Sequence, residues 1–128
     1  MIKYDSFTKQ IQINRGDSTT LAIKAKDSNG DQYNFSAGEK VKFAITERKN
    51  EDNVIFSKTI TVDEAGTTVN IPLSSEDTKI GEIINKPVIY WYEVSILTLN
   101  NEIQTIIGYD DNGAKEFVLN PEAGDTNA

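Results

Sequence analysis

The sequence contains no cysteine and no histidine among its 128 residues. The absence of cysteine excludes disulfide bonds and thiolate metal sites. The absence of histidine excludes Ser-His-Asp and Cys-His catalysis, together with any imidazole acid or base. Several familiar kinds of enzyme are therefore ruled out before any pattern is considered.

Long apolar runs and positive charge are also scarce. No apolar run approaches the roughly 18 residues of a membrane-spanning helix, and residues 1–8 (MIKYDSFT) lack the apolar core of a signal peptide. The net charge of -7 disfavours nucleic acid and anionic membranes as partners. The length predicts a single domain over residues 1–122 with a polar tail over residues 123–128, made in a cytoplasm.

Apolar and polar residues alternate along most of the chain, as in strands that bury one face. Runs of this kind cover residues 11–14, 21–25, 41–45, 54–62 and 69–73. Because parallel strands are usually apolar on both faces, the alternation predicts antiparallel pairing. The turn signals between the runs, such as Asn29-Gly30 and Asn112-Gly113, are typical of a β-sandwich or barrel.

Residues 74–84 (SSEDTKIGEII) depart from this alternation. A serine precedes two acidic residues, and Ile80, Ile83 and Ile84 follow at helix-like spacing. We expect a short helical or crossover segment here. Pro72 cannot donate a hydrogen bond to a neighbour, so its strand is expected at a sheet edge.

The longest predicted strand covers residues 87–99 and is apolar on both faces. One face carries Tyr90, Tyr92, Val94 and Ile96, and the other carries Ile89, Trp91, Leu97 and Leu99, interrupted by Glu93 and Ser95. The second face could be covered by residues 74–84 or by a neighbouring subunit. Ile89, Trp91 and Leu97 are therefore a candidate protein interface, and a Trp91 side chain in the core is the alternative. A turn at Asn100-Asn101 predicts a hairpin with the next run.

The tripeptide Arg15-Gly16-Asp17 is one that animal integrins bind. An adhesive tripeptide must project from an exposed loop, whereas here strand-like residues lie close on both sides. Gly16 can adopt the left-handed conformation that a short connection needs, and Asp17 can bond nearby backbone amides. We interpret Arg15, Gly16 and Asp17 as a structural turn, which leaves Arg15 without an assigned role.

The segment DSNGD starts like a calcium loop, with oxygen ligands at Asp27, Asn29 and Asp31. Such a loop also needs glycine at its sixth position and a bidentate carboxylate at its twelfth, and these positions hold Gln32 and Gly38. We therefore expect a turn here, with at most weak calcium binding.

Acidic pairs such as Glu76-Asp77 lie in predicted loops, and nothing in the sequence brings two carboxylates into one cleft, as a glycosidase requires. Glu93 lies within the most apolar strand, where we expect a position near a rim or an ion pair with Lys or Arg. We expect no catalytic residue, no cofactor site and no metal site, and a protein that is not an enzyme.

Several of these pieces recur in one order in a known family. They are the early hairpin from Ile11 to Ile23, GEKVKFAI at 38–45, VNIPLSSEDT at 69–78, YWYEVSI at 90–96, TIIG at 105–108 and FVLNPE at 117–122. This order resembles the N-terminal immunoglobulin-like domain of the baseplate upper protein family of tailed phages of Gram-positive bacteria. The resemblance implies an all-β, antiparallel immunoglobulin-like β-sandwich of about seven to nine strands.

The resemblance also implies a function. The expected protein is a non-enzymatic structural or adaptor protein of the phage virion, in the tail tip or baseplate, made in the cytoplasm of the bacterial host. Its partners would be other phage tail or baseplate proteins and further copies of itself, in support of the host-adsorption apparatus. Two alternatives remain open: a carbohydrate- or host-receptor-binding module, and a capsid or tail decoration protein of immunoglobulin-like fold. Upper baseplate proteins usually continue into a helical linker, whereas this chain stops at Ala128.

Overall fold

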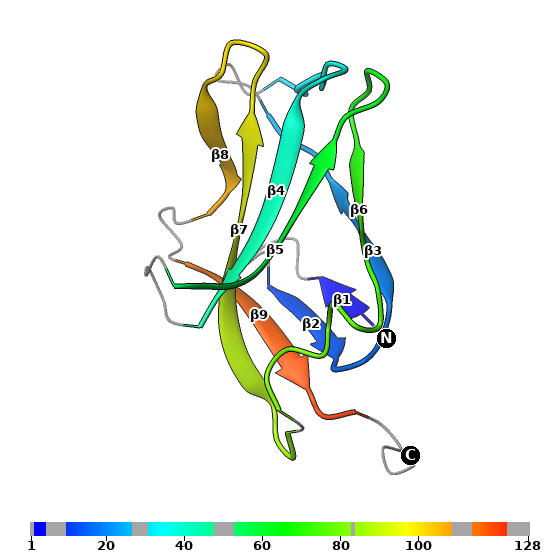
Figure 1. Ribbon diagram of the computed structural model, residues 1–128, viewed down its shortest axis with the longest axis vertical. Coiled ribbons are helices and arrows are strands. Elements are labelled where there is room, and N and C mark those ends of the chain that lie inside the picture. The colour runs from blue at the N-terminus through cyan, green and yellow to red at the C-terminus, as the bar shows by residue number, and fades with distance from the viewer. Residues whose placement is uncertain are drawn as a thin grey trace.

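The computed structural model describes residues 2–4, 10–26, 31–47, 53–82, 84–108 and 114–122, with residues 2–4 described by their backbone alone. These residues form nine strands and no helix (Figure 1). The strands are β1 (Ile2–Tyr4), β2 (Ile11–Asn14), β3 (Thr19–Ile23), β4 (Lys40–Thr46), β5 (Val54–Thr61), β6 (Val69–Leu73), β7 (Val88–Leu97), β8 (Ile103–Ile107) and β9 (Lys115–Asn120). The expectation of an all-β chain is confirmed.

The strands form two sheets. The larger sheet has the order β1-β2-β9-β7-β4-β5, and the smaller consists of β3 and β6. β7 is the central strand of the larger sheet, and β4 pairs with Trp91–Leu97 along one of its edges. Its other edge is shared, because β9 pairs with Val88–Tyr92 and β8 pairs with Val94–Leu97. β8 therefore lies beside one half of β7 and β9 beside the other half, as Figure 1 shows.

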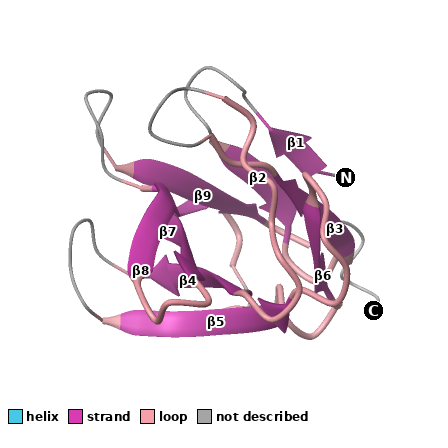
Figure 2. Ribbon diagram, turned by 90° about the horizontal axis from the view of Figure 1, so that it is seen from above, coloured by secondary structure: helices cyan, strands magenta, loops and turns pink. Residues whose placement is uncertain are grey.

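The hydrophobic core lies between the two sheets, which face each other in Figure 2. The alternating residues Val69, Ile71 and Leu73 of β6 are buried against this core, and their neighbours are exposed. Phe43 of β4 is fully buried, and its ring packs near those of three other aromatic residues, Phe56, Tyr92 and Phe117. Burying each such side chain stabilises the fold by about 1.5–3 kcal/mol. The predicted inward faces of these strands are confirmed.

One pair of strands contradicts the expectation of antiparallel pairing. β2 and β9 run parallel, with Ile11 opposite Phe117 and Ile13 opposite Leu119. Alternation shows only that one face of a strand is buried, and it carries no information about the direction of the neighbouring strand. These two strands are separated by almost the whole chain, so no tight hairpin imposes an antiparallel direction on them.

The helical part of the prediction for residues 74–84 is wrong for the residues that are described there, which exclude residue 83. Residues 75–78 form a single turn, closed by reciprocal hydrogen bonds. The Ser74 N–H donates to Asp77 Oδ2 over 2.8 Å, and the Asp77 N–H donates to Ser74 Oγ over 3.1 Å. Lys58 of β5 pairs with Asp77 at 3.0 Å and fixes the turn against the sheet. The crossover part of the prediction is correct, because the segment links β6 of the smaller sheet to β7 of the larger one.

The predicted turn at Asn100-Asn101 and the predicted edge position of Pro72 both lie within the described residues. Residues 98–102 join β7 to β8 in an antiparallel hairpin, with Asn101 at a φ of 63°. Pro72 lies in β6, whose one hydrogen-bonded neighbour among the described strands is β3. Asn29-Gly30, Asn112-Gly113 and the tail over residues 123–128 lie outside the described residues.

Candidate functional site

The Arg15-Gly16-Asp17 element lies in the connection between β2 and β3, and Arg15 is only 8% exposed. The Arg15 guanidinium donates to the carbonyl oxygens of Ile80 and Gly81, over 3.2 and 2.8 Å, and forms an ion pair with Glu122. The Arg15 N–H also donates to the Asn120 carbonyl oxygen over 2.9 Å. A guanidinium held in this way cannot reach a receptor, so the tripeptide does not have the geometry of an adhesive loop.

Gly16 and Asp17 are held by the same crossover segment. Gly16 has a φ of +90°, which favours glycine, and its N–H donates to Thr78 Oγ1 over 2.9 Å. The Thr78 hydroxyl, 1% exposed, donates in turn to the Asp17 carbonyl oxygen over 2.8 Å. Residues 15, 78, 80, 81 and 122 are termed here the Arg15 network. It joins three segments that are far apart in the sequence.

The candidate interface residues Ile89, Trp91 and Leu97 all lie on the face of β7 that points away from the core. Ile89 is 46% exposed, whereas Trp91 and Leu97 are half-buried. Trp91 is therefore not a core residue, because the core side of β7 is formed by the alternate residues, such as Tyr90 and Tyr92. The crossover segment covers that core side, where Gly81 lies next to Tyr90, and not the Trp91 side.

The candidate interface is divided into two parts along β7. Leu97 is six residues beyond Trp91, which is about 20 Å along a strand, and the exposed Glu93 lies between them. Around Trp91 the outer face continues across the sheet, since Trp91 lies opposite Thr46 of β4, and Thr46 lies opposite Val54 of β5. Ile89 lies opposite Val118 of β9. Val118 itself is only 8% exposed. We call Ile89, Trp91 and Val54 the outer patch.

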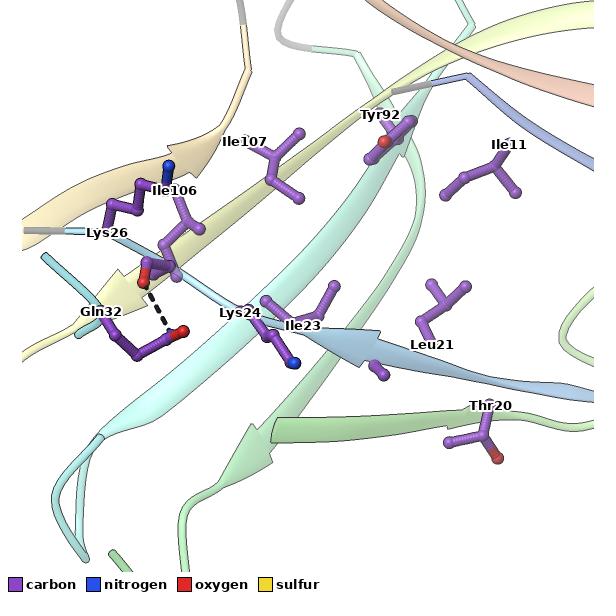
Figure 3. Close-up of a pocket in the computed structure, with 12 residues that line it drawn as sticks. Ile11, Thr20, Leu21, Ile23, Lys24, Lys26, Gln32, Tyr92, Ile106 and Ile107 are labelled. Carbon is purple, nitrogen blue, oxygen red and sulfur yellow. Dashed lines mark hydrogen bonds between the residues drawn. The ribbon is translucent and has the colours of Figure 1, made fainter. Parts of the chain in front are cut away.

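A second feature was not anticipated from the sequence. A cleft of about 800 Å³ opens between β3 and β8 (Figure 3). Its walls are apolar and its rim is polar; it is lined by Ile11, Thr20, Leu21, Ala22, Ile23, Lys24, Ala25, Lys26, Gln32, Tyr92, Ile106 and Ile107. Because these residues come from five separate stretches of the chain, no local sequence pattern predicts the cleft. The nearest signal is the change from apolar alternation to two lysines at the end of β3.

Two titratable groups outside the Arg15 network, Asp77 and Tyr33, make structural contacts. The backbone N–H of Ser74, followed by Lys58, lowers the pKa of Asp77, against the opposing effect of burial. Burial, aided by the hydrogen bond to Glu39, raises the pKa of Tyr33 to about 12. Glu93 is exposed on the outer face beside Gly108. Glu93 lines neither the cleft between β3 and β8 nor a smaller pocket of about 360 Å³, which Glu47, Glu76 and Asp77 line together.

Within the described ranges, no group of three or more acidic side chains is placed to hold a metal ion. Of the residues considered for calcium, Asp27 and Asn29 lie outside those ranges, and Asp31 is exposed.

Comparison with known proteins identifies no relative. No protein-family model matches the chain, and no curated protein or solved structure is similar to it at a significant level. In the part of the chain that the structure describes, no helix has the length and apolar character to cross a membrane.

Proposed function

We propose that the two sheets form an immunoglobulin-like β-sandwich. In that fold strands B and E belong to one sheet and strands G, F and C to the other, to which the variable type adds C′. Here β3-β6 corresponds to B-E, and β9-β7-β4-β5 corresponds to G-F-C-C′. The corresponding strands also follow one another along the chain in the order B, C, C′, E, F, G. β8 is an additional strand between F and G.

We further propose that the protein is a non-enzymatic structural or adaptor protein of a phage virion, in the tail tip or baseplate. The resemblance carried by the early hairpin, the crossover segment and the closing strand supports this location. The Arg15 network adds support, because it joins those same three pieces in space. If these three sequence pieces recur because the fold needs them, contacts that join them in the folded chain are expected.

The observation that carries an adaptor function is the outer patch. Ile89 is 46% exposed on the central strand of the larger sheet, near a half-buried tryptophan. The other face of this strand is already in the core. Exposed apolar surface centred on tryptophan is typical of the buried centre of protein interfaces. Glu116 lies opposite Trp91, and the chain has a net charge of -7. The partner surface that fits is therefore an apolar protrusion ringed by Lys or Arg on another virion protein.

The experiment is a pull-down of tail-tip and baseplate components by the purified chain, with mass measured by light scattering. Trp91→Ala should weaken capture at least about tenfold, as expected for a tryptophan at the centre of an interface, and leave the circular dichroism spectrum unchanged. Leu99→Ala is the matched control, because Leu99 is 60% exposed but lies outside the patch, in the β7–β8 turn. Normal capture by Trp91→Ala, or an unfolded variant, would reject the proposed role.

The arrangement of aromatic side chains disfavours a carbohydrate-binding module. Such a module would need two or more exposed aromatic residues around a groove. Among the residues whose side chains are described, Tyr90, Tyr92, Phe43 and Phe117 are buried, and Trp91 alone lies on the outer face of β7. Saccharide binding in a glycan array would contradict the adaptor proposal.

A further inference from the structure

We propose that the cleft between β3 and β8 is a second docking site, which accepts an extended, acidic segment of a partner protein as an additional strand. The site is separate from the outer patch, which lies on the opposite face of the larger sheet. The inference rests on three features of the cleft: two strand edges that pair with no described strand, an apolar interior and a cationic rim.

The first feature is the pair of edges. β3 has one hydrogen-bonded neighbour among the described strands, β6, and β8 has one, β7. Apart from Tyr92, no described residue of β6 or β7 lines the cleft. The cleft therefore lies along the edges of β3 and β8 that face away from β6 and β7. Thr20, Ala22 and Lys24 are exposed along this stretch of β3 and just beyond it. An unpaired edge presents backbone N–H and C=O groups that can bond an incoming strand.

The second feature is the chemistry of the interior. Leu21 and Ile23 point from β3 toward the core, and Ile106 and Ile107 of β8 are half-buried opposite them (Figure 3). Successive side chains of a strand point to opposite faces. A strand lying along β3 would therefore direct every second side chain toward this apolar wall, where apolar side chains are favoured.

The third feature is the charge of the rim. Lys24 and Lys26 are exposed, two residues apart, and they are the only ionisable side chains other than Tyr92 among the described lining residues. Opposite charges on directly facing positions of two strands stabilise the pair, and like charges destabilise it. The outward side chains of the incoming strand are therefore expected to be Glu or Asp. The same lysines oppose pairing with the β3 edge of a second copy, so the occupant is a different segment.

The test uses a blocked peptide of about six residues in which Glu and Val alternate, with binding to the full chain followed by isothermal titration calorimetry. We expect binding that weakens with salt, and hydrogen-exchange protection of the amides of residues 20–24. Replacing Glu by Lys in the peptide should abolish binding. Methylating the peptide amides that face β3 should also abolish it, because those amides could no longer donate to the edge.

The variant Lys24→Glu/Lys26→Glu should bind the peptide roughly fivefold to tenfold more weakly. Lys40→Glu/Lys42→Glu is the matched control, because these two lysines are also exposed and two residues apart, on the outer face of β4. Absence of peptide binding, equal binding by the cleft variant, or equal binding of the methylated peptide would overturn the proposal. Binding of laurate without binding of the peptide would also overturn it, and would indicate a site for small amphipathic anions.

Discussion

The two ends of the core are closed in different ways. At one end, the connection between β2 and β3 is joined by hydrogen bonds to the crossover segment and to the end of β9, through the buried side chains of Arg15 and Thr78. At the other, the strands β3 and β8 diverge and leave an apolar cleft with exposed lysines at its rim. At the first end the polar groups form hydrogen bonds within the chain, so this end has a structural role. At the second end strand edges and lysine side chains face outward, so this end is available for binding.

The largest difference between the two ends should appear when one cation is removed from each. Arg15→Met removes a buried guanidinium and leaves Glu122 and two carbonyl oxygens without their donor. We expect the free energy of unfolding to fall by about 2–4 kcal/mol in urea denaturation. Lys26→Met, at the exposed rim of the cleft, should change it by less than about 0.5 kcal/mol. Equal effects of the two substitutions would remove the distinction between the ends.

A smaller contrast is expected from two glycines. Gly16 lies in the closed end with a φ of +90°, so Gly16→Ala places a side chain in a left-handed conformation at a cost of about 1–2 kcal/mol. Gly66 bonds Phe35 near the other end, and a Cβ added to it meets nothing within 4 Å. Gly66→Ala should therefore be neutral, or stabilising by up to about 1 kcal/mol. Thermal unfolding of both variants measures the difference, and a Gly16→Ala variant as stable as the parent would contradict it.

The smallest effect concerns Tyr33, which follows the cleft residue Gln32 and donates to Glu39 over 2.6 Å. Its pKa rises from 10.0 to about 12 in the folded protein. A raised folded-state pKa contributes stability that is complete below pH 10 and is lost as the pH rises toward 12. The melting temperature should therefore fall more steeply between these pH values for the parent chain than for Tyr33→Phe. Parallel pH profiles would show that this hydroxyl does not couple to folding.

Sequence alternation predicts the inward and outward faces well, because burial on one face is a local property of a strand. It identifies Phe43 and Ile71 as core residues, and it places Ile89 and Trp91 together on one face of β7. The choice between a core and an outer position for Trp91 needed the structure. Both faces of that stretch are apolar, and only the positions of the neighbouring strands show which one the core occupies.

The features that the sequence does not predict all depend on distant segments. Arg15 has no visible partner nearby, because Glu122 is 107 residues away. The parallel direction of β9 relative to β2 and the position of the cleft depend in the same way on how the sheets assemble.

The capping pattern of Ser74 and Asp77 is typical of a helix start. Here it closes one turn, since Lys58 holds Asp77 and the following residues extend toward the core.

The parallel pair formed by β2 and β9 has a mechanical consequence. A force that draws the residues before β2 away from those after β9 acts along both strands in opposite directions, because the two strands run the same way. The pair is then loaded in shear, and its hydrogen bonds share the force instead of opening one after another. The ion pair between Arg15 and Glu122, just past the end of this pair, resists the same displacement. A protein that transmits tension between other components would benefit from this arrangement of its first and last core strands.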